Sequence, residues 1–220
     1  MLRDKDRLLR IIAGLEKAYP EAHCELSYSN PLQLLIATIL SAQCTDRQVN
    51  IVTPGLFKKY RTAADFAQAD PTEFEADIRR IGLYRSKAKN IQAACRALLE
   101  KHGGEVPRTM DELLELNGVG RKTANVVLGN AFDVSVGIVV DTHVARLSIR
   151  LALTRQTVPE KIERDLQKVV PPEKWTIFSH LLIWHGRRRC FARNPDCSRC
   201  EILAECPTGK KILKKRAKTL

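Results

Sequence analysis

The sequence predicts an all-α protein, and three observations lead to this fold class. Apolar residues recur at helical spacing in most segments of the chain. Several segments begin with residues that are typical of helix N-termini. A single segment, VSVGIVVD at residues 134–141, resembles a strand, and it is short. Together these patterns predict about ten helices.

Start and stop residues place the helices in the first half of the chain. Asn30 and Pro31 begin a helix whose next residues, LQLLIATIL, are apolar nearly all round, as in a buried helix. Asp70 caps the segment DPTEFEADIRRIG, which we expect to end at Gly82. The segment YRSKAKNIQAACRALLEKHGG then carries apolar residues at helical spacing up to Leu99.

The second half of the chain shows similar signals. The segment TMDELLEL begins with a capping box from Thr109 to Glu112. The segment TVPEKIERDLQKVV has the same pattern from Thr157 to Glu160. The segment WTIFSHLLIWH is expected to form a last buried helix because it is mostly apolar.

The charge of the chain indicates a polyanionic partner, with nucleic acid first. The 220 residues carry a net charge of +12, and the isoelectric point is near 9.6. The segment from Arg187 to Leu220 holds eleven basic and three acidic residues, so it alone carries +8. A simple solvated tail is an equally good interpretation of its last residues, KKILKKRAKTL.

Hydropathy and cysteine usage indicate a soluble, cytoplasmic protein without membrane association. No stretch approaches the roughly 20 apolar residues of a membrane span, and the N-terminus lacks a signal-peptide core. Because the cytoplasm is reducing and the number of cysteines is seven, we do not expect a disulfide framework. Cys24, Cys44 and Cys95 lack metal-ligand partners nearby in sequence and are expected to be small core residues.

A G-x-G turn between two predicted helices, in LNGVGRKTANVVLGNAF, suggests a helix-hairpin-helix. The stretch Gly118-Val119-Gly120 lacks the third glycine and the preceding strand of a dinucleotide-binding loop. Glycine lets backbone N–H groups approach a phosphate, and the following helix adds the positive end of its dipole. Such a turn would bind the DNA backbone without reading base sequence. The alternative is an ordinary connection between helices.

Two residues near this turn are candidates for chemistry. Lys122 follows the turn, where the helix N-terminus and Arg121 disfavour the ammonium form, and a neutral amine can attack a sugar carbon. Asp141, in VVDTHVARL, precedes another helical pattern. It is either a plain helix cap or a carboxylate that assists Lys122, and both roles are compatible.

Four cysteines near the C-terminus have the spacing C-x6-C-x2-C-x5-C, which suits a metal centre. They are Cys190, Cys197, Cys200 and Cys206. Four thiolates can hold either zinc or an iron–sulfur cluster, so spacing alone leaves both open. Zinc ribbons usually contain two C-x2-C pairs, whereas this segment contains one.

Taken in order, these motifs resemble the bacterial endonuclease III family of helix-hairpin-helix DNA glycosylase/AP lyases. The resemblance rests on LSAQCTD, IGLYRSKAKNI, GEVP, LNGVGRKTANVVLGNAF, VVDTH and the four-cysteine loop, from about residue 25 to residue 206. It implies two helical domains with a DNA-binding cleft between them. Residues 24–133 would form a six-helix domain with the hairpin. Residues 1–23 and 134–220 would form a second domain with a [4Fe–4S] cluster loop.

The resemblance also implies a function and site residues. The family removes oxidised pyrimidines from damaged double-stranded DNA and cuts the abasic strand by β-elimination through a lysine Schiff base. We therefore expect a monomer located at the bacterial nucleoid. Lys122 would be the nucleophile, Asp141 its carboxylate partner, and the four cysteines the [4Fe–4S] ligands. The expected DNA contacts are Gln43 as gap filler, Leu83 as wedge, Gly118, Val119, Gly120, Arg121, His143, Arg187 and Arg193.

Four positions depart from the family pattern. Asn117 stands where proline usually precedes the hairpin glycine, and Cys44 where alanine is common. Asn194 and Asp196 occupy cluster-loop positions where basic residues are familiar. The grip of this loop on phosphate is therefore expected to depend on Arg193, with Arg187–Arg189 as further candidates.

Two other functions compete with this hypothesis. A monofunctional adenine glycosylase of the same superfamily would lack the hairpin lysine and usually carries an extra C-terminal domain. A non-catalytic DNA-binding module would use the hairpin and the cluster only as scaffold. Lys122 and the length of 220 residues argue against the adenine glycosylase, and the presence of both Lys122 and Asp141 argues against the non-catalytic module.

Overall fold

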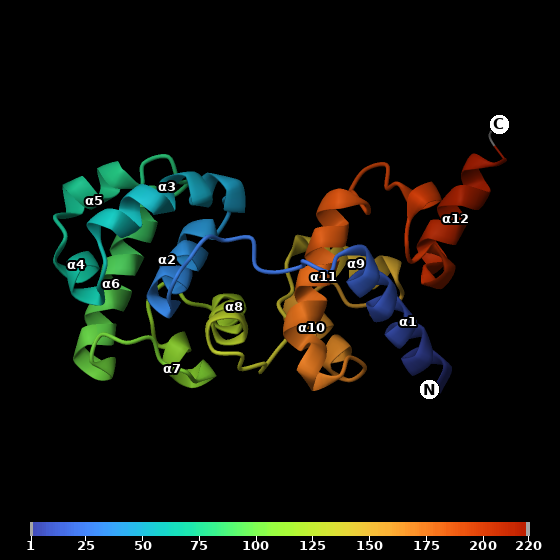
Figure 1. Ribbon diagram of the computed structural model, residues 1–220, viewed down its shortest axis with the longest axis horizontal. Coiled ribbons are helices and arrows are strands. Elements are labelled where there is room, and N and C mark those ends of the chain that lie inside the picture. The colour runs from blue at the N-terminus through green and yellow to red at the C-terminus, as the bar shows by residue number, and fades with distance from the viewer. Residues whose placement is uncertain (1, 219–220) are drawn as a thin grey trace. The chain divides into compact units, whose positions relative to one another are not determined.

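The computed structural model describes residues 2–218 and is built from helices (Figure 1). Within this range it contains twelve α-helices, three short 3-10 helices and no β-strand, which confirms the all-α fold class. The predicted total of about ten helices is too low. Helix α4 has six residues and α7 has five, and such short helices offer few turns in which apolar periodicity can be recognised.

The α-helices follow one another along the chain with short connections. Their bounds are α1 (Leu2–Ala18), α2 (Pro31–Ser41), α3 (Asp46–Lys59), α4 (Ala63–Gln68), α5 (Pro71–Asp77), α6 (Tyr84–His102), α7 (Met110–Leu114), α8 (Arg121–Ala131), α9 (Thr142–Arg150), α10 (Pro159–Gln167), α11 (Trp175–Arg188) and α12 (Pro207–Arg216). The 3-10 helices are η1 (Pro172–Lys174), η2 (Cys197–Arg199) and η3 (Leu203–Glu205). In the described part of the chain, no helix combines the length and apolar content needed to cross a membrane.

The chain divides into two compact units. The hairpin unit is continuous, from Glu25 to Val134, and contains α2 to α8. The cysteine unit combines Met1–Cys24 with Ser135–Leu220 and contains α1 and α9 to α12. Each unit buries apolar residues of its own, so each has a separate core.

The hairpin unit packs around α2 and α6. Helix α2 buries every residue from Leu34 to Leu40, as its apolar sequence predicts, and the Asn30 side chain caps it by accepting from the Gln33 N–H. Beside α6, the rings of Tyr60, Phe66 and Phe74 lie with centroids 5.2–5.8 Å apart. Tilted and edge-to-face contacts at these distances stabilise a core beyond simple burial.

The cysteine unit has a core made by α1, α9, α10 and α11. Its largest fully buried side chains include Leu8, Ile11, Leu15 and Phe178. Helices α9 and α11 approach closely at Gly186, where an added Cβ would lie 2.8 Å from the His143 ring. This close approach fixes the start of α9 relative to the cysteine loop.

Three local predictions need correction. The helix that Asp70 caps ends at Asp77 and not at Gly82. Thr157 is not a cap: Val158 is the N-cap of α10 without a side-chain hydrogen bond, because Pro159 takes the first helical position. Thr109 does cap α7, but the Glu112 carboxylate contacts the Thr109 hydroxyl, so the reciprocal capping box does not form.

The remaining differences concern the expected strand and the isolated cysteines. Residues 134–140 form no β-ladder, and the Val139 N–H donates instead to Ser179 Oγ at 3.0 Å. Cys95 is a core residue as predicted, with 1% of its surface exposed. Cys24 and Cys44 are only half-buried, because both lie in connections outside the helices.

A buried lysine joins α2 to α6 in the hairpin unit. The Lys87 ammonium group donates to the carbonyl oxygen of Leu40 at 2.8 Å, near the end of α2. Lys87 is buried although it is charged, and its apolar stem runs through the core. This hydrogen bond ties the last turn of α2 to the first turn of α6.

We predict that Lys87→Met lowers the free energy of unfolding by about 1–3 kcal/mol, because the Leu40 carbonyl would stay buried without a donor. Urea denaturation followed by circular dichroism measures this change. Lys89→Met is the matched control, because Lys89 is exposed on the same helix and should change stability by roughly 0.5 kcal/mol or less. Equal effects of the two substitutions would contradict the structural role of Lys87.

Candidate nucleic-acid interface and metal centre

The turn between α7 and α8 has the geometry of a helix-hairpin-helix. Gly118 has a φ of +78°, which only glycine adopts readily, and an added Cβ would lie 3.0 Å from Asn90 Cβ of α6. Val119 is 7% exposed and anchors the turn in the core. Gly120 is the N-cap of α8 and makes no side-chain cap, so the first amides of α8 have no capping side chain.

Lys122 is the second residue of α8 and is exposed, as is its neighbour Arg121. The amine therefore projects from the N-terminal end of a helix, directly after the glycine turn. A helix N-terminus is a favourable place for an anion such as a phosphate. The arrangement brings a primary amine and an anion-binding backbone to one place.

Gln43 and Leu83 lie in turns with unusual backbone geometry. Their φ angles are 54° and 58°, a left-handed conformation that is strained for side chains with a Cβ. Leu83 directly precedes α6 and is 61% exposed, although it is a large apolar residue. An added Cβ on Gly82 would lie 3.9 Å from the Gln43 carbonyl oxygen, so the two turns are adjacent.

Three predicted DNA contacts of the hairpin unit therefore gather near the N-terminal half of α6. Leu83 begins this helix, the Gln43 turn lies beside Gly82, and Gly118 packs on Asn90. These positions are far apart in sequence, and the fold of this unit brings them together. An exposed apolar side chain beside an anion-binding turn suits a protein that grips and opens a duplex.

Asp141 belongs to the cysteine unit, where it is the N-cap of α9. One carboxylate oxygen accepts from the N–H groups of His143 and Val144, both at 2.8 Å. The capping role that the sequence suggested is thus present. The carboxylate remains partly exposed, so capping leaves it accessible to a second partner.

His143 and Arg187 lie on the facing helices α9 and α11. The Nδ1 atom of His143 is 3.1 Å from Nη2 of Arg146, whose guanidinium also donates to the carbonyl oxygens of Gly186 and Cys190. Partial burial lowers the pKa of His143 below its usual value, although Asp141 acts in the opposite direction. The His143 imidazole and Arg187 are both half-buried.

All four cysteines of the C-terminal motif line one pocket in the cysteine unit. Its walls are largely apolar and include Leu147, Leu151, Ile202, Leu203 and Ile212, together with Cys190, Cys197, Cys200 and Cys206. Gly209 packs closely beside it, because an added Cβ would lie 3.0 Å from Leu203 Cδ1 and 3.4 Å from Cys206 Sγ. Residues separated by up to sixteen positions thus face a common space.

Three of these sulfur atoms have an N–H group close by. Arg150 Nη1 lies 3.2 Å from Cys190 Sγ, and the Gly209 N–H lies 3.2 Å from Cys206 Sγ. The Nε2 atom of His185 lies 3.6 Å from Cys200 Sγ. Without a metal, burial raises the pKa of the Cys200 thiol to about 11. The donors therefore suit a thiolate whose charge is stabilised by a bound metal.

The sulfur atoms are spread more widely than a single ion requires. No three of the four cysteines, all of which are described, have their Sγ atoms within 4.8 Å of one another. A tetrahedral zinc site with Zn–S bonds of about 2.3 Å would place its sulfurs about 3.8 Å apart. His185, Cys200 and Glu201 do bring ligand atoms that close. However, the two nitrogen atoms of His185 face different partners. Nε2 faces Cys200, whereas Nδ1 lies 3.7 Å from Glu201.

The cysteine loop is held by arginines of its own unit. Arg150 donates to the carbonyl oxygens of Phe191 and Ala192 at 2.7 and 2.9 Å. Asp196 forms ion pairs with Arg189 at 2.9 Å and Arg199 at 2.7 Å. Asp196, one of the positions that depart from the family pattern, therefore stabilises the loop through ion pairs within it.

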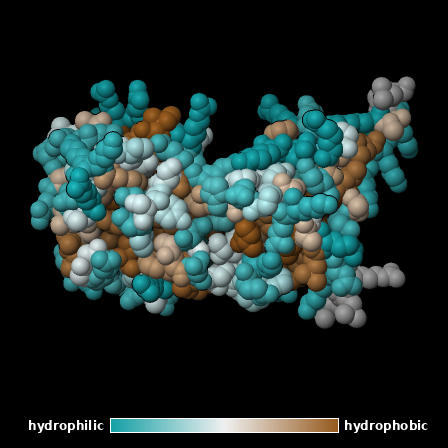
Figure 2. All heavy atoms as spheres, viewed as in Figure 1, coloured by the Kyte–Doolittle hydropathy of each residue, from teal (hydrophilic) through white to brown (hydrophobic). Residues whose placement is uncertain are grey.

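These contacts distinguish the arginines that the sequence suggested for phosphate binding. Arg189 is committed to Asp196 and to Glu201, whose carboxylate lies 2.9 Å away. The Arg188 guanidinium stacks 3.8 Å from the Trp184 ring centroid. Arg193 is exposed in the first part of the loop, next to Asn194, which has a left-handed φ of 49°. On the face drawn in Figure 2, both hydrophilic and hydrophobic residues lie along α12.

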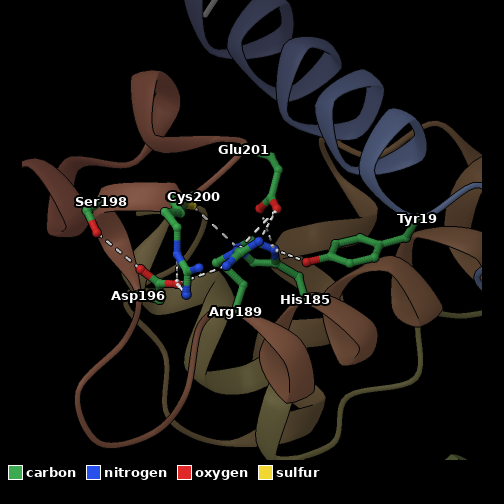
Figure 3. A network of polar contacts seen from close by, with 8 residues as sticks. Tyr19, His185, Arg189, Asp196, Ser198, Cys200 and Glu201 are labelled. Atoms are coloured by element: carbon green, nitrogen blue, oxygen red, sulfur yellow. Dashed lines mark hydrogen bonds and ion pairs between the residues drawn. The ribbon is translucent and has the colours of Figure 1, made fainter.

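Two residues of the metal centre were not identified from the sequence. Tyr19 and His185 are 166 positions apart, yet their Oη and Nδ1 atoms lie 3.0 Å apart. Figure 3 shows the His185 ring between Tyr19 and Cys200. The only sequence signal was a histidine inside a buried helix, five residues before the first cysteine ligand. That position is more often an ordinary core residue.

Known proteins support this geometry. Residues 36–172 match the family model of the HhH-GPD superfamily base excision DNA repair proteins. Endonuclease III of Synechocystis sp. is 53% identical over 209 residues, which cover 95% of each chain.

Two solved structures are similar over nearly the whole chain. A non-covalent endonuclease III–DNA complex has a TM-score of 0.90 and 49% identity, and the match covers 96% of this chain and 98% of the other. A trapped endonuclease III–DNA covalent intermediate has a TM-score of 0.90 and 50% identity, with coverage of 95% and 98%. The chain therefore belongs to the endonuclease III family of the HhH-GPD superfamily of base excision DNA repair proteins.

Proposed function

We propose that this endonuclease III family enzyme, a DNA glycosylase and AP lyase, removes oxidised pyrimidines from duplex DNA and cuts the abasic strand by β-elimination. The observation that carries the mechanism is the exposed Lys122 amine at the start of α8, directly after the glycine turn. The similar protein captured in a covalent DNA intermediate supports a nucleophile of this kind. The protein acts as a monomer in this proposal.

Binding uses the hairpin unit first. The glycine turn and the first amides of α8 hold backbone phosphate, which gives affinity without base specificity. Leu83 enters the base stack as an apolar wedge, and Gln43 fills the space that the extruded nucleotide leaves. The exposure of Leu83 and the adjacency of the two turns support these roles. Arg193 adds a phosphate contact from the cysteine loop.

In the chemical step, the Lys122 amine attacks C1′ of the damaged nucleotide. A C1′–N bond forms as the C1′–base bond breaks, and the base leaves with the bonding electrons. Asp141 stabilises positive charge that develops on the sugar, which requires its carboxylate to reach the same sugar as Lys122. The C1′–O4′ bond then breaks as the nitrogen loses a proton and O4′ gains one, which opens the sugar and gives the Schiff base. Loss of a proton from C2′ of this Schiff base then breaks the C3′–O bond and expels the 3′ phosphate by β-elimination.

A [4Fe–4S] cluster is the cofactor that the four cysteines fit best. Their shared apolar pocket, their N–H donors and the wide spacing of their sulfur atoms support a cluster over a single zinc ion. Cys190, Cys197, Cys200 and Cys206 would be its ligands. When bound, the cluster supplies a rigid cross-link and a redox centre. Arg146 and Arg150 orient the loop that begins at the first ligand.

We predict that Lys122→Gln abolishes the covalent intermediate, because the amide cannot form an imine. Strand cleavage should fall roughly 10³-fold or more, as is typical when a covalent nucleophile is deleted. Borohydride trapping on abasic-site DNA measures the intermediate. Lys161→Gln is the matched control, since it removes an exposed lysine of α10 and should trap normally. A trapped adduct at the unmodified rate in Lys122→Gln would rule out this nucleophile.

We predict a different result for Asp141→Asn, which keeps the helix-capping oxygen and removes the charge. Excision of thymine glycol should slow roughly 10²-fold or more because stabilisation of the sugar is lost. Trapping on a preformed abasic site should largely survive, since the base is already absent. Single-turnover assays on the two substrates separate these effects. Normal excision by Asp141→Asn would leave Asp141 as a helix cap alone.

We predict about four iron and four sulfide per chain in natively purified protein, with the yellow-brown colour of a [4Fe–4S] cluster. Cys197→Ser should lose much of this iron and also fold less stably. Elemental analysis and visible absorption measure the cluster. Cys95→Ser provides a control, because Cys95 lies in the core of the other unit and should leave iron content unchanged. Stoichiometric zinc without iron would contradict the proposed cofactor.

A further inference from the structure

The ring of His185 is placed between a cysteine ligand and a tyrosine. His185 lies on α11, is 1% exposed, and has Nε2 3.6 Å from Cys200 Sγ. Its other nitrogen, Nδ1, lies 3.0 Å from the Tyr19 hydroxyl, which belongs to the segment after α1 (Figure 3). The edge of the Tyr19 ring also packs against the imidazole at 5.8 Å between centroids.

The carboxylate beside this imidazole is paired with another residue. Glu201 is the nearest carboxylate, but it is paired with Arg189 through hydrogen bonds of 2.9 and 3.2 Å. The distance from His185 Nδ1 to Glu201 is 3.7 Å, beyond a normal hydrogen bond. Glu201 therefore serves Arg189, and the Tyr19 hydroxyl is the close partner of His185 Nδ1.

The two partners of the ring select one tautomer. A protonated tyrosine can donate its O–H to Nδ1, which then holds the free lone pair of the neutral ring. The single ring proton must consequently lie on Nε2, the nitrogen that faces Cys200. A metal-bound thiolate has no proton of its own, so it accepts from Nε2 and would repel a lone pair there. Both contacts favour the same tautomer.

We propose that His185 donates a hydrogen bond from Nε2 to the Cys200 sulfur, and that Tyr19 holds the ring in this tautomer, so that the pair sets the reduction potential of the bound cluster. This inference rests on the proposed [4Fe–4S] cofactor. His185 and Tyr19 are positioning residues, since neither touches DNA or supplies a ligand in this proposal. The chain of contacts runs from Tyr19 through His185 to Cys200.

The expected direction of the effect follows from charge. Reduction adds an electron to the cluster and increases the negative charge on its sulfur ligands. A hydrogen bond to a sulfur stabilises that charge, so it raises the reduction potential. The effect is large where water is excluded, and His185 is 1% exposed.

Four variants test the proposal. His185→Leu removes the donor, and His185→Gln keeps an N–H group that can reach the sulfur. Tyr19→Phe removes the hydroxyl that fixes the tautomer while it preserves the ring. Tyr28→Phe is the matched control, because it deletes a tyrosine hydroxyl that bonds the Asn130 carbonyl in the hairpin unit.

Iron and sulfide content, the midpoint potential by protein voltammetry and the Fe–S stretching bands in resonance Raman are measured on each purified protein. His185→Leu should have a more negative potential and shifted Fe–S bands. Tyr19→Phe should shift the potential in the same direction by a smaller amount, since His185 can then adopt either tautomer. His185→Gln should recover part of the potential, and Tyr28→Phe should match the unmodified protein.

The outcomes separate this inference from the proposed cofactor. If the unmodified protein holds no iron–sulfur cluster, both the cofactor and this inference fail. If the clusters are intact but His185→Leu and Tyr19→Phe leave the potential and the Fe–S bands unchanged, the hydrogen bond is wrong and the cofactor stands. If His185→Leu does not fold, the Tyr19→Phe variant decides, because an unchanged potential there overturns the role of the pair.

Discussion

The left-handed backbone of Gly118, packed against Asn90, is the constraint on which the hairpin depends. A Cβ at this position would approach Asn90 to 3.0 Å in a conformation that already disfavours side chains. Because the turn is this tight, α8 begins at Arg121 and Lys122 occupies its second position. The placement of the amine is therefore a consequence of backbone geometry, and the exposed amides beside it belong to the same turn. The turn forms with Asn117 as the residue that precedes Gly118.

The cysteine unit has a different requirement. It must hold an irregular loop around the sulfur atoms of four cysteines. Arg146 and Arg150 of α9 donate to carbonyl oxygens at the start of the loop, and Asp196 braces it through Arg189. These groups satisfy a backbone that has no regular secondary structure to bond with. The acidic Asp196 thus forms internal ion pairs with Arg189 and Arg199.

The sequence was most informative where the determining interactions are local. The caps at Asn30 and Asp70 involve atoms three residues apart, and their N-terminal signals are correct. At Thr157 the same reasoning failed, because Pro159 shifted the start of the helix by one residue. A full capping box does occur at Thr62 and Asp65, in a helix too short to show an apolar pattern.

Features that depend on distant residues could not be predicted in this way. Nothing local identifies Lys87 as buried, because its partner is a carbonyl 47 positions away. The strained turn at Leu83 has no glycine at that position, so its left-handed φ is visible only in the folded unit. Tyr19 and His185 meet through the packing of α1 against α11, and their sequence separation hides the contact. The candidate functional residues were identified from sequence motifs, whereas the groups that orient them are visible only in the folded structure.

The central claim is that the Lys122 amine is the group that bonds to DNA. Peptide mapping by mass spectrometry, after borohydride reduction of the enzyme on abasic-site DNA and digestion, tests this claim most directly. The account predicts that the added mass of the reduced sugar fragment lies on the peptide that contains Lys122, with fragment ions that assign it to this side chain. An adduct confined to another lysine or to the N-terminal amine would contradict it.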